Sequence, residues 1–450
     1  MEQNRFNRMK QFFLYGMIGF LLTMISCQQD DPLQTFQIKV KPVYPAGYEA
    51  KTGVAVKLEN TSTHAIFKAP TDANGVATFD VTAGMYAISY TEIRTVDLKV
   101  FIFNGTNNNL IVSNQSPTDV DLPLLESVTN QLVIKELYCG GCQKDDGSGT
   151  FQRDPYVILY NNSSQPATFQ SICLGIVNPY NSNGTNNDYK DGTTLFYQAE
   201  GWIPENPGIW TFQQSITLEP YQQIVIALNN AVDNTKTYKQ SINFDNPAYY
   251  CAYDIAVYSN TTYYVPPAPS IPTSHYLKAY HFGAGNAWTM SVTSPAFYIF
   301  EPKGMTPQEW ANSADNTNLY GTTLRRKVPV DWVIDAVEVF AYANAANHKR
   351  LTPAVDAGYV ELFNQYGFTL YRNVDQEATE AIPENEGKLV YGYALGTKGI
   401  TVGSQVINGT TDPSGIDAEA SIKNGARIIY LDTNNSSNDF HQRSRASLRN

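Results

Sequence analysis

Charged residues are scarce in this chain. Asp, Glu, Lys and Arg make up 16% of the 450 residues, against roughly 25% in typical soluble domains. The 31 basic residues are outnumbered by 42 acidic ones, which gives a formal net charge of −11. Because nucleic-acid affinity depends on neutralising phosphates with Lys and Arg, this balance argues against a nucleic-acid partner.

The common catalytic motifs are missing as well. The sequence has no G-x-S-x-G nucleophile elbow and no Walker A motif, and none of its five histidines lies in an H-E-x-x-H motif. We therefore predict that the protein is not an enzyme and uses no metal and no cofactor. A hydrolase could still use two carboxylates that are distant in sequence, as glycosidases do, and this alternative stays open.

The chain has no hydrophobic run long enough to cross a bilayer as a helix. Its longest run, Phe12–Ile25, falls short of the roughly 20 residues required. It follows three basic residues and ends just before Cys27, which is the layout of a secretory signal peptide. The segment Met24-Ile25-Ser26-Cys27 resembles the lipobox of bacterial lipoproteins. This resemblance implies removal of residues 1–26 and attachment of fatty acid, such as palmitate, to Cys27.

A short acidic segment follows this cysteine. Gln28-Gln29-Asp30-Asp31 resembles the export signal of Bacteroidota-type surface lipoproteins. The resemblance implies that Asp30 and Asp31 direct the protein to the surface of the cell outer membrane. Residues 27–34 are expected to form the lipidated tether.

Four cysteines remain after Cys27, namely Cys139, Cys142, Cys173 and Cys251. In an exported protein an even number of cysteines allows disulfides. The Cys139-Gly-Gly-Cys142 spacing suggests a structural disulfide, with free thiols or a metal or redox role as alternatives. A zinc site needs about four ligands, and the sequence has no second C-x-x-C motif to supply them. The pairing of these cysteines cannot be decided from the sequence.

Residues 35–127 alternate apolar and polar positions in several short runs, which predicts β-strands. "TDANGVATFDV" contains an Asn-Gly step, a strong hairpin signal, and "GMYAISY" follows it. With "GVAVKLENT", this set resembles the prealbumin-like, carboxypeptidase-regulatory-like β-sandwich. The resemblance implies a spacer or binding module without catalytic residues.

Residues 128–450 carry a second set of strand patterns. "QLVIKELYCGG", "DPYVILYNN", "WVIDAVEVF", "GFTLYR" and "DTNNSSNDF" resemble, in this order, segments of the lamin-tail domain, an immunoglobulin-like sandwich. Insertions relative to that domain are expected at about 232–327 and 374–426. The chain is thus predicted to be mainly β, with a prealbumin-like sandwich followed by an insertion-bearing lamin-tail-like sandwich.

The first insertion is rich in tyrosine and proline. Its "PPAPSIP" run disfavours a helix and extends the chain, whereas "MTPQEWANSA" predicts a helix with Thr306 as cap, Pro307 at its first position and Glu309 closing a capping box. Tyrosine and tryptophan favour interfaces, so we predict an exposed aromatic binding surface here. The candidate residues in or near the insertion are Tyr249, Tyr250, Tyr263, Tyr264 and Trp288, and two more, Trp202 and Trp210, flank the earlier segment "IPENPGI". Sandwich cores also use aromatic residues heavily, so some of these could be core residues instead.

Together these features resemble an uncharacterised family of Bacteroidota-type surface lipoproteins. The resemblance implies a non-catalytic binding or accessory module that serves nutrient uptake, with an outer-membrane TonB-dependent transporter or its ligand as partner. A surface-anchored hydrolase acting on glycans and an adhesive structural module are the alternatives. The ligand, which could be a glycan or another small molecule, and the oligomeric state cannot be determined from the sequence.

Overall fold

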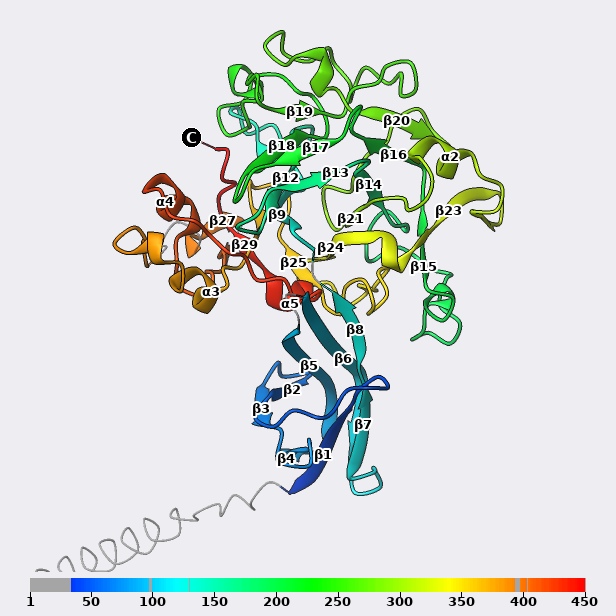
Figure 1. Cartoon of the computed structure of the whole chain (residues 1–450), viewed down its shortest axis with the longest axis vertical. Helices are drawn as coiled ribbons and strands as arrows, with labels where there is room; N and C mark the ends of the chain where they lie inside the picture. The colour runs from blue at the N-terminus through cyan, green and yellow to red at the C-terminus, as the bar shows by residue number, and fades with distance from the viewer. Residues whose placement is uncertain (1–33, 97–98, 129, 393–396, 403, 450) are drawn as a thin grey trace, which may run out of the picture.

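Two β-rich parts are joined end to end in the computed structural model, which describes residues 34–449 except 97–98, 129, 393–396 and 403 (Figure 1). Strands β1–β8 form the smaller part, which we call the stem. Strands β9–β29 and the short helices form the larger part, which we call the body. The chain is mainly β and built of layered sheets, as the sequence predicts.

The stem consists of two sheets around one core. The three-stranded sheet has the order β4-β1-β7, with bounds Ala77–Thr82, Thr35–Val43 and Asp119–Pro123. The five-stranded sheet has the order β3-β2-β5-β6-β8, with bounds Ile66–Pro70, Ala55–Asn60, Gly84–Val96, Lys99–Val112 and Leu125–Val128. Every second residue near the middle of β1, such as Ile38 and Val40, is buried. The alternation read from the sequence therefore marks the core face of the stem.

The long β5–β6 hairpin connects the stem to the body (Figure 1). The Asn104 side chain on β6 donates to the carbonyl oxygen of Thr433 at 2.5 Å. The Asn438 side chain of the body donates in turn to the hydroxyl of Thr91 on β5, at 3.1 Å. Both strands of the hairpin thus form side-chain hydrogen bonds with the body.

The body is built on two six-stranded sheets. The first has the order β19-β18-β12-β9-β26-β29, with bounds Tyr250–Cys251, Gln223–Ala227, Tyr156–Asn161, Leu132–Tyr138, Thr369–Arg372 and Phe440–Arg443. The second has the order β20-β16-β14-β21-β24-β25, with bounds Lys278–His281, Gly208–Thr211, Cys173–Ile176, Ala296–Phe300, Val333–Ala341 and Val360–Leu362. All seven residues of β9 are buried, because other segments of the protein cover both faces of its sheet.

Shorter elements surround these sheets. The remaining strands are β10 Cys142–Gln143, β11 Thr150–Phe151, β13 Ala167–Phe169, β15 Trp202–Glu205, β17 Ile216–Leu218, β22 Thr317–Tyr320, β23 Thr323–Pro329, β27 Ile400–Val402 and β28 Gln405–Ile407. The α-helices are α2 Pro307–Asn312, α3 Gln376–Glu380, α4 Ala418–Lys423 and α5 Ser436–Asp439. The 3-10 helices are η1 Phe196–Gln198, η2 Asn234–Lys236, η3 Thr273–His275, η4 Val330–Trp332 and η5 Pro383–Asn385. Helix α2 has the Thr306–Glu309 capping box and the first-turn Pro307 that the sequence predicts.

Residues 232–327 are integral to the body rather than appended to it. They supply β20 and β21, and β21 pairs with both β14 and β24 in the middle of the second sheet. Segment 374–426, in contrast, lies outside the two six-stranded sheets and carries α3 and α4 on one side of the body (Figure 1). The first expected insertion is therefore part of the sandwich, and the second forms a lateral lobe.

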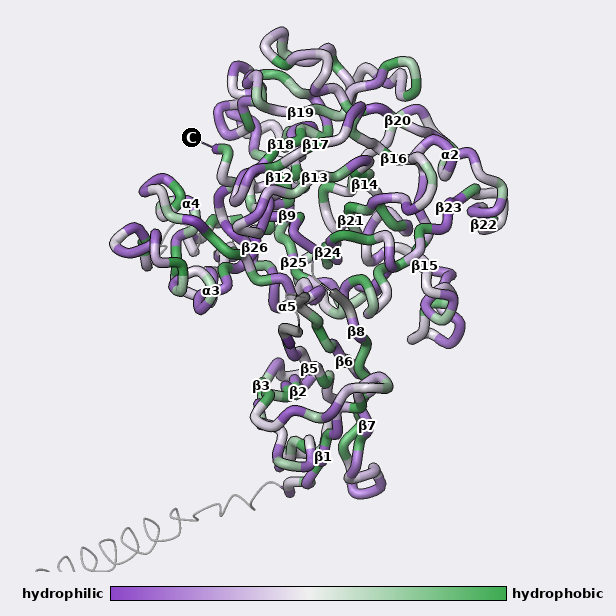
Figure 2. The backbone as a smooth tube through the Cα atoms, in the orientation of Figure 1, coloured by the Kyte–Doolittle hydropathy of each residue, from purple (hydrophilic) through white to green (hydrophobic). Residues whose placement is uncertain are grey.

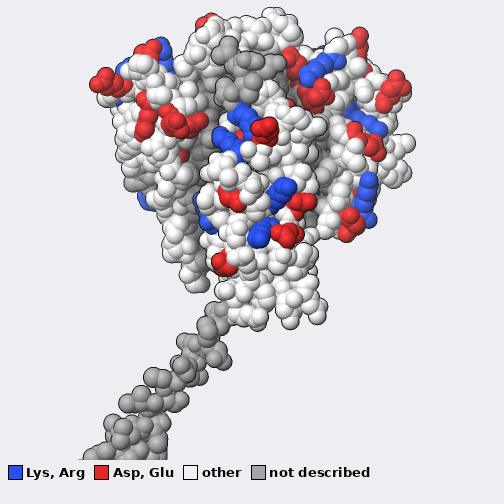
Figure 3. Space-filling model, turned by 60° about the horizontal axis from the view of Figure 1, so that its bottom comes forward, with Lys and Arg blue, Asp and Glu red and all other residues white. Residues whose placement is uncertain are grey.

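Apolar residues concentrate on the central strands, including β9 and β21, whereas the outer loops are largely hydrophilic (Figure 2). Within the described ranges, no helix is long and apolar enough to span a membrane. Basic and acidic side chains alternate over the face that includes the lower end of the stem, without a continuous basic patch on that face (Figure 3).

Candidate functional site

The loops after β18 lie at the end of the body that is farthest from the stem (Figure 1). They contribute to a cleft of about 390 Å³, which we call the aromatic cleft. Its main side chains are Phe151, Tyr180, Tyr238 and Tyr263 together with Lys144 and Arg153. Its walls come from chain segments that are distant in sequence, so only the folded body assembles it.

The aromatic side chains present ring surface to this cleft. Tyr180 is 45% exposed and its hydroxyl donates to the carbonyl oxygen of Met290 at 3.0 Å, which fixes the ring. The rings of Phe151 and Tyr238 lie 4.7 Å apart between centroids, tilted by 31°. Tyr263 is half-buried and packs against the main hydrophobic core of the body. The rings are therefore anchored before any ligand binds.

Polar groups complete the lining. The Arg153 guanidinium lies 5.6 Å from the Phe151 ring centroid, and its Nη1 donates to the carbonyl oxygen of Thr262 at 3.2 Å. The buried Nδ2 of Asn229 has no hydrogen-bond partner among the described atoms. No Asp or Glu occurs among the described residues that line the cleft, whereas Lys144 and Arg153 bring two positive charges.

Tyr263 is the only residue of the predicted binding surface that lines the aromatic cleft. Trp210, Tyr264 and Trp288 are at most 1% exposed and Trp202 is 5% exposed, so their prediction as exposed binding residues is wrong. The physical reason is packing: Trp210 lies 5.7 Å from Tyr264 between ring centroids, inside the main core. The structure thus makes most of these aromatics core residues.

Tyr249 and Tyr250 are half-buried and lie outside the cleft. The Tyr250 ring stacks on His275, with 4.1 Å between centroids and an interplanar angle of 15°. It also contacts Phe212 edge-on at 5.1 Å. These contacts give Tyr250 a structural role in holding the proline-rich segment against the second sheet.

The cysteine pair does not form the expected disulfide. Cys139 and Cys142 are both free and buried in the structure, with two glycines of positive φ between them. Burial raises the pKa of both thiols, to about 12 for Cys142. Since the thiolate is the reactive form, these cysteines are poorly suited to redox chemistry. No group of His, Cys, Asp and Glu side chains in the described part of the chain could hold a metal ion.

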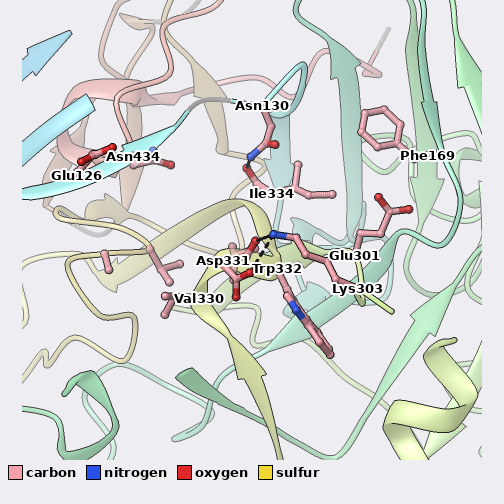
Figure 4. Close-up of a pocket in the computed structure, with 13 residues that line it drawn as sticks. Glu126, Asn130, Phe169, Glu301, Lys303, Val330, Asp331, Trp332, Ile334 and Asn434 are labelled. Carbon is pink, nitrogen blue, oxygen red and sulfur yellow. Dashed lines mark hydrogen bonds and ion pairs between the residues drawn. The ribbon is translucent and has the colours of Figure 1, made fainter. Parts of the chain in front are cut away.

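A second cleft, of about 470 Å³, lies where stem and body meet, and Figure 4 shows it. Lys303 and Asp331 form an ion pair across it at 3.0 Å. The carboxylate of Glu301 accepts hydrogen bonds from the backbone amides of Gln170 and Ser171 at 2.7 and 2.8 Å. These charged groups satisfy one another or the backbone, so the junction cleft is a weaker ligand site than the aromatic cleft.

Three segments that carry the lamin-tail resemblance converge on one buried arginine. Arg372 on β26 binds Asp335 on β24 through its Nη2. Its Nη1 lies 3.5 Å from Asp432 and 3.6 Å from Asp439. All four side chains are at most 8% exposed. We call this group the ionic cluster, and it ties both six-stranded sheets to the C-terminal segment.

The ionic cluster holds three carboxylates for one guanidinium. Removal from water disfavours the charged carboxylate, so burial raises the pKa of Asp432 to about 7 and that of Asp439 to about 8. The Asp439 carboxylate also accepts from the backbone amide of Thr433 at 2.9 and 3.0 Å. It therefore shapes the loop that contacts the stem.

The raised pKa values predict a pH dependence of stability. An unfolded Asp titrates near pH 4, so the folded protein binds more protons than the unfolded chain between pH 4 and 8. The free energy of unfolding should therefore fall as pH rises from 6.5 to 8, by up to about 1.4 kcal/mol per pH unit for each group. Burial lowers the pKa of His441 to about 3, whereas an unfolded His titrates near 6.5, so this side chain opposes the decrease slightly near pH 6.5 and is neutral in both states by pH 8. Urea unfolding at several pH values measures the slope.

Asp432→Asn provides the control for this prediction. The variant should show a shallower decrease between pH 6.5 and 8, because it removes one carboxylate whose pKa is raised into this range. A slope that stays the same in Asp432→Asn would show that the decrease arises from other groups.

Cys27, Asp30 and Asp31 lie outside the described residues. Their roles in lipidation and export therefore stay predictions.

The fold and its clefts define a mainly β protein with a narrow stem and a larger, cleft-bearing body. Residues 219–391 match the family described as "Protein of unknown function (DUF4876)". The matched region includes the loops after β18 that help to form the aromatic cleft.

Two solved structures are similar in part. A DUF4876 family protein from Bacteroides thetaiotaomicron is 17% identical, with 91% of this chain and 94% of that chain covered and a TM-score of 0.48. BcpA, the major pilin subunit of Bacillus cereus, is 12% identical, with 65% and 95% covered and a TM-score of 0.15. No curated protein matches this chain.

Proposed function

We propose that this protein is a non-catalytic binding module displayed on the outer-membrane surface, and that the aromatic cleft holds its ligand. The observation that supports this function most directly is the composition of the cleft. Anchored tyrosine rings, amide groups and two cations line it, without a carboxylate among its described residues. Such a lining offers contact surface and hydrogen bonds, but no carboxylate to act as general acid, base or nucleophile.

The position of the cleft fits display from a membrane. Strand β1 begins at the lower end of the stem, and the loops that contribute to the cleft lie at the opposite end of the body (Figure 1). A lipid on Cys27 would thus place the stem next to the membrane and the aromatic cleft away from it. We propose that the bound ligand is handed to, or held for, an outer-membrane transporter.

Substitution of Tyr180 tests whether this cleft is the binding site. We expect Tyr180→Ala to abolish the thermal stabilisation that a ligand gives the wild-type protein, because this ring is the most exposed aromatic surface of the cleft. A ligand at 100 times its dissociation constant stabilises a protein by about 2.7 kcal/mol. Thermal unfolding in the presence of oligosaccharides, peptides and cofactor-sized molecules provides the measurement.

Tyr391→Ala is the matched control, since Tyr391 is 54% exposed and lies outside the cleft. It should keep every ligand effect of the wild type. The proposal is contradicted if each stabilising compound acts equally on Tyr180→Ala, because the ligand would then bind elsewhere.

A further inference from the structure

We infer that the ligand of the aromatic cleft is an acidic saccharide, that is, a sugar ring bearing a carboxylate or a sulfate. This inference rests on the proposed function, which makes the cleft a ligand site. Three properties of the cleft support it: the ring faces, the local charge and the remaining polar groups.

The ring faces fit a sugar. Tyr180, Tyr238 and Tyr263 come from three separate segments and all border the cleft. An aromatic ring has a negative face, which attracts the weakly positive C–H groups on the face of a pyranose. Tyr180 leaves 45% of its surface open to solvent while its hydroxyl is held by the Met290 carbonyl. A flat ligand can therefore stack there without reordering the side chain.

The local charge differs from that of the whole chain. The protein carries a formal net charge of −11, yet Lys144 and Arg153 are the only charged side chains among the described residues of the lining. The guanidinium of Arg153 is oriented by its bond to the Thr262 carbonyl. Its other N–H groups form a planar fork that matches a carboxylate or sulfate.

Two nearby carboxylates offset part of the Lys144 charge without lining the cleft, so Arg153 is the main positive group of the site. Asp145 and Asp146 lie in the adjoining turn and are absent from the lining. Asp145 accepts from the backbone amide of Lys239 at 3.1 Å, and Asp146 accepts from that of Ser148 at 2.9 Å. Both carboxylates thus hold the turn that carries Lys144.

The remaining polar groups suit hydroxyls. The Asn229 amide is buried, borders the cleft and has an Nδ2 donor without a hydrogen-bond partner in the described structure. The hydroxyls of Thr150, Thr262 and Thr289 lie in the same lining. These threonine hydroxyls can exchange hydrogen bonds with sugar hydroxyls, whereas the Asn229 Nδ2 is closed to solvent. A neutral sugar would use the rings and these groups but leave both cations unpaired.

Calorimetric titration of the protein with three defined probes tests the inference. The probes are an oligogalacturonate, a sulfated oligosaccharide and an uncharged cello-oligosaccharide of similar length. We expect at least one acidic probe to bind more tightly than the uncharged one, with an affinity that falls as salt rises. Arg153→Gln should weaken acidic-probe binding about 10- to 100-fold, as expected for loss of a charge-assisted hydrogen bond. Arg427→Gln, at an exposed arginine outside the cleft, should leave it unchanged.

The outcomes separate this inference from the proposed function. Equal binding of charged and uncharged probes, or no effect of Arg153→Gln in a protein of unchanged melting temperature, overturns the acidic-saccharide inference. Binding of only a non-saccharide compound overturns it too, but if Tyr180→Ala abolishes that binding, the cleft is still a ligand site. Saccharide binding that is unaffected by Tyr180→Ala overturns both.

Discussion

Arg372→Met is expected to lower the free energy of unfolding by about 3–5 kcal/mol, the range for removing one partner of a buried ion pair. The substitution leaves Asp335, Asp432 and Asp439 facing one another without the cation that pairs with them. It also removes the bond from Arg372 Nε to the carbonyl oxygen of Ile134 on β9, at 2.7 Å. Urea unfolding followed by tryptophan fluorescence at pH 7 measures the loss.

Arg427→Met is the matched control for Arg372→Met. Arg427 pairs with Glu384 at 2.7 Å, but the two side chains are 48% and 54% exposed. An exposed pair contributes about 1 kcal/mol at most, so this variant should unfold close to the wild-type midpoint. Equal losses in the two variants would contradict a special role for the ionic cluster.

A double variant separates charge from packing. In Arg372→Met with Asp335→Asn, one of the carboxylates left without a cation is neutral. Part of the lost stability should return relative to Arg372→Met alone. No recovery would mean that the loss comes from packing and the Ile134 bond rather than from unpaired charge.

Cys27→Ala is expected to shift essentially all of the protein from the membrane fraction to the soluble fraction. Two or three acyl chains on Cys27 would give about 0.8 kcal/mol per buried methylene, enough for stable anchoring. The described part of the chain offers no membrane-spanning helix as a substitute. Fractionation of cells followed by immunoblotting measures the distribution, and a variant that stays with the outer membrane would overturn the lipid-anchor prediction.

Asp30→Ala with Asp31→Ala separates anchoring from export. This variant keeps Cys27, so it should remain membrane-bound. If the acidic pair directs surface export, the variant should be protected from protease added to intact cells. Unchanged cleavage would show that the pair acts only as a polar linker.

The strands were predictable because their signal is local. Alternating residues in β1 depend only on neighbours in the sequence, and they appear in the fold. The Asn74-Gly75 step lies in a turn before β4, but the hairpin prediction is wrong, because β3 pairs with β2 and β4 pairs with β1 in the other sheet of the stem. The capping box at Thr306 is local in the same sense. The sequence shows only the separate segments that form the ionic cluster. No local pattern in them indicates that Asp335 and Asp432 meet at Arg372.

The aromatic cleft could not be predicted for a related reason. Its rings come from positions as far apart as Phe151 and Tyr263, and none of the local patterns around them differs from those of core aromatics. Trp210 and Tyr180 are both aromatic residues near sheet strands, yet one is fully buried and the other is 45% exposed. Which aromatic faces water is decided by the chain that covers it, and that chain is distant in sequence.

The β5–β6 hairpin limits how the length of the stem can change in evolution. Strand β6 has 14 residues, which extend over about 45 Å at 3.3 Å per residue. One extra residue in each strand below Asn104 would exchange the inward and outward faces above the insertion and turn Asn104 away from the Thr433 carbonyl. Two extra residues per strand would keep each side chain on its present face and would raise the body by about 7 Å. They would also rotate the body relative to the stem, because the strands are twisted. The length of the stem and the orientation of the body are therefore coupled, and related proteins with a longer stem should differ from this one by an even number of residues in each of these two strands.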